Sequence, residues 1–422
     1  MGRARPLTSN QFFGMLALVA FFPSFPGYFG LALVSFIPVV FAAYALFSIY
    51  RSEYWNVNSV AYWIFGLYLT LLLISLTRST ESLIANDFIE IGKPLFFFLT
   101  YAYFHNKFSG ATRDQMCGYV DRLMLLLIIA AVWGVLEALV PAFDRASAFL
   151  FKGGRSAVQG KAVFSFISPY TFASILVLPL GYSMLRFGTG LKGGRYFFLT
   201  VLFLLALLFT QSRSVFLAFA ISGSTFLLFV ATRPWVPNVM RYRTILACLA
   251  GLLVVGFPTA VVVVRDQLPY LYSGLKIVFE QLMEGDVISF IFSTPSISNR
   301  YEQLVQVLEY HGGVPFIGAG IAKSLIYPES FYSLYLLRVG LLGLLLHLLI
   351  IGFALMRVLA FSRILARDHK ELSVFFLALG LYFFSLPFSY FSSALNDQIR
   401  TGFIFYMLLA LVFSFNTRGT EK

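Results

Sequence analysis

The stretch Phe331–Met356, FYSLYLLRVGLLGLLLHLLIIGFALM, decides the class of this protein. It is longer than the roughly 20 apolar residues that a helix needs to cross the hydrocarbon core of a bilayer. The rest of the chain has the same character: 59% of its 422 residues are hydrophobic, only 12% are charged, and the mean hydropathy is +0.82. Soluble domains are about one-quarter charged, and disordered chains are poor in aromatic residues, whereas this chain has 49 Phe. The sequence therefore predicts an all-α integral membrane protein.

Hydropathy predicts a single polytopic domain, 1–422, with about twelve transmembrane helices. The predicted spans are 11–24, 29–50, 59–77, 83–104, 123–141, 170–187, 196–211, 214–232, 244–264, 331–356, 373–390 and 401–416. Two connections on the outer side are long, 142–169 and 265–330. In the second, Arg300–Tyr310 has apolar residues at helical spacing, so we expect a large, partly helical periplasmic loop before the tenth span.

The charge distribution predicts which side of the membrane each loop faces. With an even number of spans and a cytoplasmic N-terminus, 18 of the 31 Lys and Arg and six of the 19 Asp and Glu lie on the cytoplasmic side. These residues account for the whole formal charge of +12, as the positive-inside rule expects. We therefore predict a multi-pass protein of the bacterial inner membrane with both termini in the cytoplasm. Nucleic acid is not needed as a partner to explain the charge.

Motifs for most soluble catalytic chemistries are missing from the sequence. Cys117 and Cys248 offer neither a disulfide framework nor a metal site, and there is no Gly-rich phosphate loop, metal-ligand His cluster or nucleophile elbow. Chemistry would have to come from arginines and carboxylates. On the predicted outer face these are Arg213, Arg300, Glu329, Asp397 and Arg400. Arg suits phosphate because its planar fork can bond two oxygens. The alternative is that each residue snorkels to the interface or pairs locally.

A second set of charges lies within the predicted spans. Asp87, Glu90 and Lys93 recur three residues apart and so share a helix face, and Glu137 lies near the outer end of the fifth span. Intramembrane charges are often functional. We nevertheless favour a structural interpretation, in which Glu90 and Lys93 form an internal ion pair that packs helices together.

The segment from Ser298 to Gly343 resembles a known family. It contains Asn299-Arg300, a helix, Pro315-x-x-Gly318-x-Gly320, then Glu329-Ser330, nine residues, and Gly340-x-x-Gly343. This order resembles the C-terminal region of the O-antigen ligase and Wzy-type O-antigen polymerase superfamily. The upstream Gln211-Ser212-Arg213-Ser214 is similar to the family motif whose Arg binds lipid pyrophosphate, and Asp397 resembles the acid before the last span. The similar motifs cover about residues 205–410.

The resemblance implies a GT-C-like, metal-independent, inverting glycosyltransferase that needs no cofactor. Its donor would be an undecaprenyl-pyrophosphate-linked glycan and its acceptor a second glycan. Arg213 and Arg300 would bind the pyrophosphate, and Glu329 would be the catalytic base that takes the acceptor proton. Asp397, Arg400 and Tyr327 are candidate supporting residues. An exposed carboxylate is a weak base at neutral pH, so this role predicts an apolar environment around Glu329. A flippase and a chain-length regulator are possible partners.

Three functions remain open at this point. Ligases of this family carry His where this chain has Glu329, and this difference favours a polymerase of lipid-linked repeat units over a ligase that transfers glycan to lipid A–core. A flippase or secondary transporter is the alternative from another class, since many spans and intramembrane charges are compatible with it. Against transport stand the absence of internal repeats and the position of the candidate residues on one face rather than near the midplane.

Overall fold

The computed structural model describes residues 6–29, 32–52, 59–78, 85–153, 160–189, 193–232, 295–320 and 328–415, with the single positions 272, 273, 276, 280 and 326. Every regular element in this part of the chain is a helix. The all-helical class predicted from composition is therefore confirmed for the described residues.

Each predicted span that lies in the described residues contains a helix, and further short helices lie between the spans. In chain order they are α1 (Ser9–Leu16), its π-helical continuation η1 (Ala17–Phe21), α2 (Pro26–Phe29), α3 (Ala32–Arg51), α4 (Val60–Arg78), α5 (Ala85–Ser109), α6 (Arg113–Leu139), α7 (Pro141–Ser147), the π-helical η2 (Ala148–Lys152), α8 (Pro169–Thr189), α9 (Gly193–Phe209), α10 (Arg213–Ala231), α15 (Pro295–Tyr310), α16 (Phe331–Leu365), α17 (Lys370–Ser389), the 3₁₀ turn η5 (Leu395–Asp397) and α18 (Ile399–Ser414). The predicted span 244–264 lies outside the described residues.

Six of the described helices are long and apolar enough to cross a membrane by length and composition: α4, α6, α8, α10, α16 and α17. Shorter apolar helices include α9, α18 and the continuous run of α1 and η1. The large apolar side chains exposed on the outer helices, among them Phe36, Trp63, Phe198 and Leu217, fit such an environment, because a soluble protein rarely leaves so much apolar surface uncovered. These features are compatible with a membrane protein.

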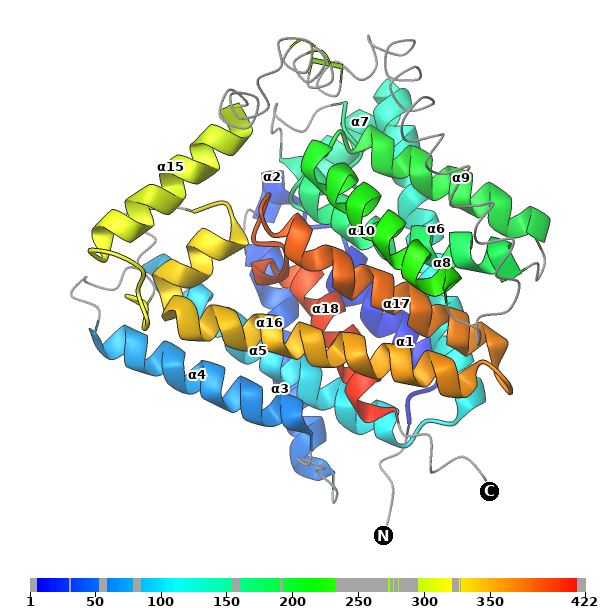
Figure 1. The fold of residues 1–422 in the computed structure, drawn as a ribbon, viewed down its shortest axis with the longest axis horizontal. Helices are drawn as coiled ribbons and strands as arrows, with labels where there is room; N and C mark the ends of the chain where they lie inside the picture. The colour runs from blue at the N-terminus through cyan, green and yellow to red at the C-terminus, as the bar shows by residue number, and fades with distance from the viewer. Residues whose placement is uncertain are drawn as a thin grey trace.

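Three helices form the interior of the bundle. Almost every residue of α8 and α18 and most residues of α17 are buried, and the ribbon shows α18 enclosed by its neighbours (Figure 1). Helix α18 packs on α5, and α17 packs between α16 and α8. Because these inner helices contact protein on all sides, they hold the ends of the outer helices in fixed positions.

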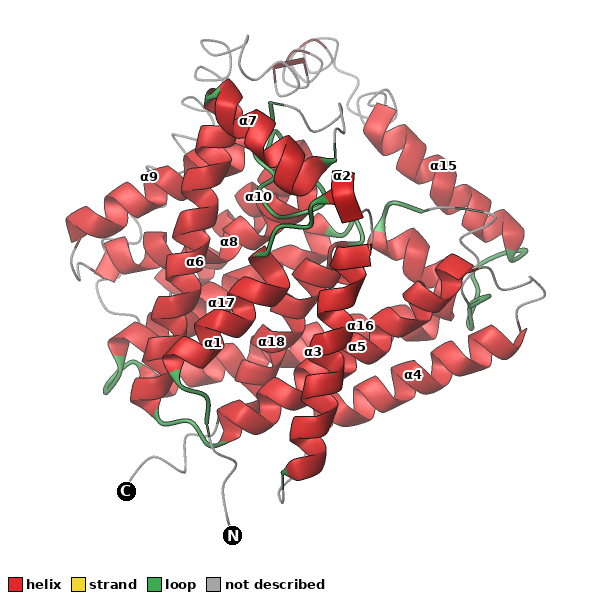
Figure 2. Cartoon of the chain, turned by 180° about the vertical axis from the view of Figure 1, so that it is seen from behind, coloured by secondary structure: helices red, strands yellow, loops and turns green. Residues whose placement is uncertain are grey.

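The two ends of the bundle differ. Helix α1 begins, and α18 ends, at the end where the chain termini are marked, whereas α7 and α15 lie at the opposite end (Figures 1 and 2). We call these the terminal end and the loop end. The charge distribution predicts that the terminal end is cytoplasmic and the loop end periplasmic. Among the candidate residues, Arg213 begins α10, Arg300 lies on α15 and Glu329 precedes α16, all toward the loop end.

Candidate functional site

Helix α16 is interrupted near the loop end. Gly340 has φ 72° and ψ −171°, which is not helical, so backbone groups on both sides of it lose their helical partners. The segment 315–320 replaces those partners with four hydrogen bonds: Ala319 N–H to Leu337 O at 2.8 Å, Gly320 N–H to Arg338 O at 3.0 Å, Leu341 N–H to Pro315 O at 2.8 Å and Leu342 N–H to Phe316 O at 3.3 Å. The Pro-x-x-Gly-x-Gly motif therefore has a structural role. It provides hydrogen-bond partners for the backbone groups at the break in α16, which little water can reach.

This repair fixes the first turns of α16 and the residue just before them. Ser330 is the N-cap residue of α16, and Glu329 precedes it. The backbone of Glu329 is held on two sides: its N–H donates to Gln303 Oε1 of α15 at 2.9 Å, and its carbonyl accepts from Ala394 N–H at 2.8 Å. The main chain at Glu329 is thus tied to both α15 and the segment before α18.

Arg300 lies opposite Glu329. Its Nη2 is 3.6 Å from Glu329 Oε2, its Nε donates to the carbonyl of Ser392 at 3.0 Å, and its guanidinium lies 5.7 Å from the centre of the Tyr170 ring. The Arg300 side chain is 12% exposed and that of Glu329 is 60% exposed. The structure therefore brings together two of the residues singled out from sequence, with the arginine held in place and the carboxylate open to solvent rather than in the apolar environment we expected.

Arg213 begins α10 at the same end of the bundle. It follows Gln211, whose positive φ of 53° turns the chain from α9 into α10. Its Nη2 donates to Ser273 Oγ at 2.8 Å. Burial, and after it the positive charge of Arg213, lower the pKa of Lys161, so these two cations lie within electrostatic range of each other. Such a basic surface is suited to an anionic group, but the described contacts of Arg213 are with a different part of the chain from those of Arg300.

Asp397 contributes to a buried charge network instead of the Arg300–Glu329 pair. Arg338 donates from Nη1 to Asp397 Oδ1 at 2.6 Å and from Nη2 to Glu90 Oε2. Lys93 Nζ lies 2.6 Å from Glu90 Oε1 and 3.5 Å from Asp397 Oδ2. Two cations and two anions therefore neutralise each other between α5, α16 and η5. The predicted Glu90–Lys93 pair is present and is half of this larger network. Asp87 lies on α5, but its side chain is outside the described part.

Sequence reasoning missed Arg338, the most buried member of this network with a side chain only 3% exposed. Its signal was an Arg within the apolar run Phe331–Met356, where an unpaired cation would be costly. The sequence could have indicated that Arg338 needs acidic partners. It could not indicate which carboxylates supply them, since Glu90 and Asp397 are far away along the chain.

Arg400 and Glu137 contact described parts of the segment 142–169, which the sequence predicts to be an outer loop. Arg400 donates to the backbone carbonyls of Ser165 and Phe22. Glu137 accepts hydrogen bonds from Val163 and Phe164 N–H groups at 2.9 and 2.8 Å through Oε2, and its Oε1 lies 2.8 Å from Lys152 Nζ. These buried charges hold loop backbone, and we assign them a positioning role. Tyr327, a candidate supporting residue, lies outside the described residues.

No protein-family profile matches the chain, and no curated protein sequence does either. Within the part of the chain that the structure describes, no group of three or more His, Cys, Asp or Glu residues could hold a metal ion. The assignment of a function must therefore rest on the site itself.

Proposed function

We propose that the protein is a membrane-embedded, inverting glycosyltransferase that polymerises undecaprenyl-pyrophosphate-linked oligosaccharide repeat units at the periplasmic face of the bacterial inner membrane. The observation that carries the proposal is the proximity of Arg300 and Glu329 at the loop end. A well-held arginine for a phosphate group and an accessible carboxylate for a sugar hydroxyl are the two groups that this transfer needs.

In the proposed reaction, Glu329 accepts the proton of an acceptor hydroxyl as its oxygen attacks the anomeric carbon of the donor sugar. The new glycosidic bond forms on the face opposite the breaking bond, so the configuration is inverted. The electron pair of the breaking bond leaves with the lipid pyrophosphate. Arg300 and Arg213 stabilise the negative charge that grows on its oxygens, because hydrogen-bond donors aimed at developing charge lower the barrier.

The 3.6 Å distance between Arg300 and Glu329 bears on how the carboxylate is activated. It is longer than a direct charge-assisted hydrogen bond of about 2.7–2.9 Å, so the two side chains form an ion pair without a direct hydrogen bond. A pyrophosphate that bonded Arg300 would compete with Glu329 for it and leave the carboxylate free to take the proton. In this scheme, binding of the donor pyrophosphate to Arg300 also releases Glu329 to act as the base.

The competing functions differ in their use of these residues. A ligase would use the same donor site with another acceptor. A transporter would need accessible charges within the bundle, but Glu90, Lys93 and Glu137 are engaged in ion pairs. We therefore propose an enzyme rather than a transporter. The experiment below distinguishes polymerisation from transfer to lipid A–core.

The test is an assay of purified protein in nanodiscs with a lipid-pyrophosphate-linked oligosaccharide, for which glycan length is read on gels. Glu329→Gln keeps the shape but cannot accept a proton, so we expect polymerisation to fall on the order of 10²- to 10⁴-fold while donor binding survives. Glu309→Gln, at an exposed carboxylate on α15, is the matched control and should remain active.

Glu329→His provides a second arm. It supplies a base with an ordinary pKa near 6.5, so it should keep some polymerisation and transfer no glycan to lipid A–core. An active Glu329→Gln protein would remove Glu329 from the chemistry. Transfer of the parent protein's glycan to added lipid A–core, without chain growth, would make it a ligase.

A further inference from the structure

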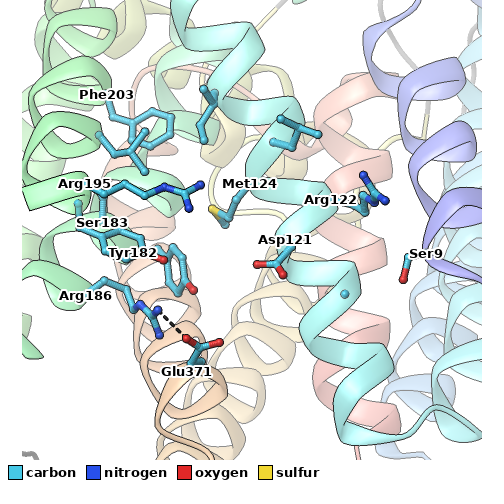
Figure 3. Close-up of a pocket in the computed structure, with 15 residues that line it drawn as sticks. Ser9, Asp121, Arg122, Met124, Tyr182, Ser183, Arg186, Arg195, Phe203 and Glu371 are labelled. Carbon is cyan, nitrogen blue, oxygen red and sulfur yellow. Dashed lines mark hydrogen bonds and ion pairs between the residues drawn. The ribbon is translucent and has the colours of Figure 1, made fainter. Parts of the chain in front are cut away.

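A cavity of about 530 Å³ lies toward the terminal end, away from the Arg300–Glu329 pair. Its walls come from α1, α6, α8, α9 and α17 (Figure 3). The volume falls within the ~300–1,000 Å³ of sites that hold small molecules. The function proposed above does not use this cavity.

The innermost polar wall contains an arginine with spare hydrogen-bond donors. Arg186 is 2% exposed, and its Nη2 donates to Glu371 Oε1 at 2.7 Å. Its guanidinium lies 4.8 Å from the centre of the Tyr196 ring and 5.8 Å from that of Tyr182. Its Nε and Nη1, however, have no hydrogen-bond partner. A buried guanidinium with unused donors is costly, and an acceptor from a ligand would satisfy these donors once the side chain turned toward the cavity.

The charge around the cavity favours an anion. Arg195 extends from α9 into the space in front of Arg186, and Asp121 faces it from α6 (Figure 3). Arg122 also belongs to the lining. Over the whole lining, three arginines stand against two carboxylates, Asp121 and Glu371, and the third of them, Arg122, lies on the Ser9 side of α6 and donates to Asn10 Oδ1 at 3.3 Å (Figure 3). A phosphate group has the acceptor oxygens that arginine forks bind best.

The remainder of the lining is apolar and extends along two helices. Met124, Leu125 and Ile128 follow Asp121 on α6, and Leu199 and Phe203 follow Tyr196 on α9. Since both helices run from the terminal end toward the middle of the bundle, the cavity is polar at one end and apolar at the other. This is the polarity of a lipid, with a charged head group and a hydrocarbon chain.

We propose that this cavity binds the phosphate head group of an anionic membrane lipid, with Arg186 and Arg195 on the phosphate oxygens and the hydrocarbon chain between α6 and α9. The lipid completes the hydrogen bonding of Arg186. Glu371 opposes it, because this carboxylate shares the same guanidinium and repels the phosphate.

Native mass spectrometry of the detergent-purified, delipidated protein tests the proposal. Phosphatidylglycerol, phosphatidylcholine and inorganic phosphate are added in separate titrations. We expect saturable binding of phosphatidylglycerol and a rise in Tm, with weaker binding of phosphatidylcholine and inorganic phosphate. Arg195→Gln should weaken phosphatidylglycerol binding roughly tenfold or more, as expected for a lost charge-assisted hydrogen bond. Arg363→Gln, at an exposed arginine in the last turn of α16, is the control and should bind like the parent.

Glu371→Gln separates a binding defect from a folding defect. It removes the opposing charge, so it should bind phosphatidylglycerol more tightly than the parent does, and a misfolded protein cannot gain affinity. The proposal is overturned if Arg195→Gln binds as well as the parent or if Glu371→Gln weakens binding. Equal retention of both lipids would mean that no head group is recognised. Equal binding of inorganic phosphate would make this a site for a soluble anion rather than a lipid.

Discussion

Gly318 and Gly340 pack backbone against backbone: a Cβ atom added to Gly340 would lie 2.8 Å from the Gly318 nitrogen and 2.5 Å from the carbonyl oxygen of Phe316. In the other direction, a Cβ on Gly318 would lie 2.5 Å from the carbonyl oxygen of Arg338. This close approach allows segment 315–320 to satisfy the break in α16. Arg300 lies on α15, which precedes this segment, and Glu329 lies just before α16, which follows it.

Gly340→Ala is therefore expected to destabilise the protein strongly. Alanine is strained at φ 72° and ψ −171°, a region that essentially only glycine occupies, which costs about 1–3 kcal/mol, and the clash with immobile backbone adds about 1–3 kcal/mol. Gly318→Ala should have the steric part alone. Gly352→Ala on the same helix meets nothing within 4 Å and should be neutral. Thermal unfolding of the detergent-purified proteins distinguishes them, and equal Tm values for Gly340→Ala and Gly352→Ala would contradict this account.

The Arg338 network predicts a rescue. Arg338→Met leaves Glu90 and Asp397 with only Lys93 between them, and breaking a buried ion pair from one side costs about 3–5 kcal/mol. Adding Asp397→Asn restores charge balance, because Glu90 and Lys93 still form a pair. We expect the double variant to unfold at a higher temperature than Arg338→Met alone. Arg363→Met, at an exposed site, should change little. A double variant less stable than the single one would mean that charge balance does not govern this region.

Arg213→Lys and Arg300→Lys should both lose most of the polymerase activity, on the order of 10²-fold, while the proteins still insert and fold. Lysine keeps the charge but lacks the planar fork that bonds two pyrophosphate oxygens. Arg145→Lys, at an exposed arginine on α7, is the matched control. Initial rates with the lipid-linked donor provide the measurement. Lysine variants as active as the parent would reduce these arginines to general positive charges.

The predicted orientation can be tested by cysteine labelling in intact spheroplasts. In a background with Cys117 and Cys248 replaced by Ser, a membrane-impermeant maleimide should label Glu302→Cys on α15 and miss Asp368→Cys between α16 and α17. Both positions are exposed, so accessibility to water is matched and only the side of the membrane differs. Permeabilised cells, in which both should react, provide the control. The opposite pattern would place the site in the cytoplasm.

Local sequence determined the helices of this protein. A run such as Phe331–Met356 is apolar over a membrane's thickness, and its backbone hydrogen bonds can be satisfied only within a helix. Some helix ends were not predicted: α6 begins at Arg113, after the N-cap residue Thr112, whose side chain accepts from Gln115 N–H, whereas the predicted span begins at 123. Hydropathy depends on neighbours in sequence, and this is why each predicted span that lies in the described residues contains a helix.

The grouping of charged residues was decided by tertiary structure. Arg300 and Glu329 meet because α15 packs against the start of α16, as the order of the motifs had suggested. Asp397 and Arg400, only three residues apart in sequence, bind different partners: Asp397 binds Arg338, and Arg400 binds the carbonyls of Ser165 and Phe22. Asp397 is thereby committed to balancing an arginine that sequence reasoning had overlooked. A local pattern indicates that a buried charge needs a partner. Which residue is the partner depends on which helices pack together, and only the tertiary structure determines this packing.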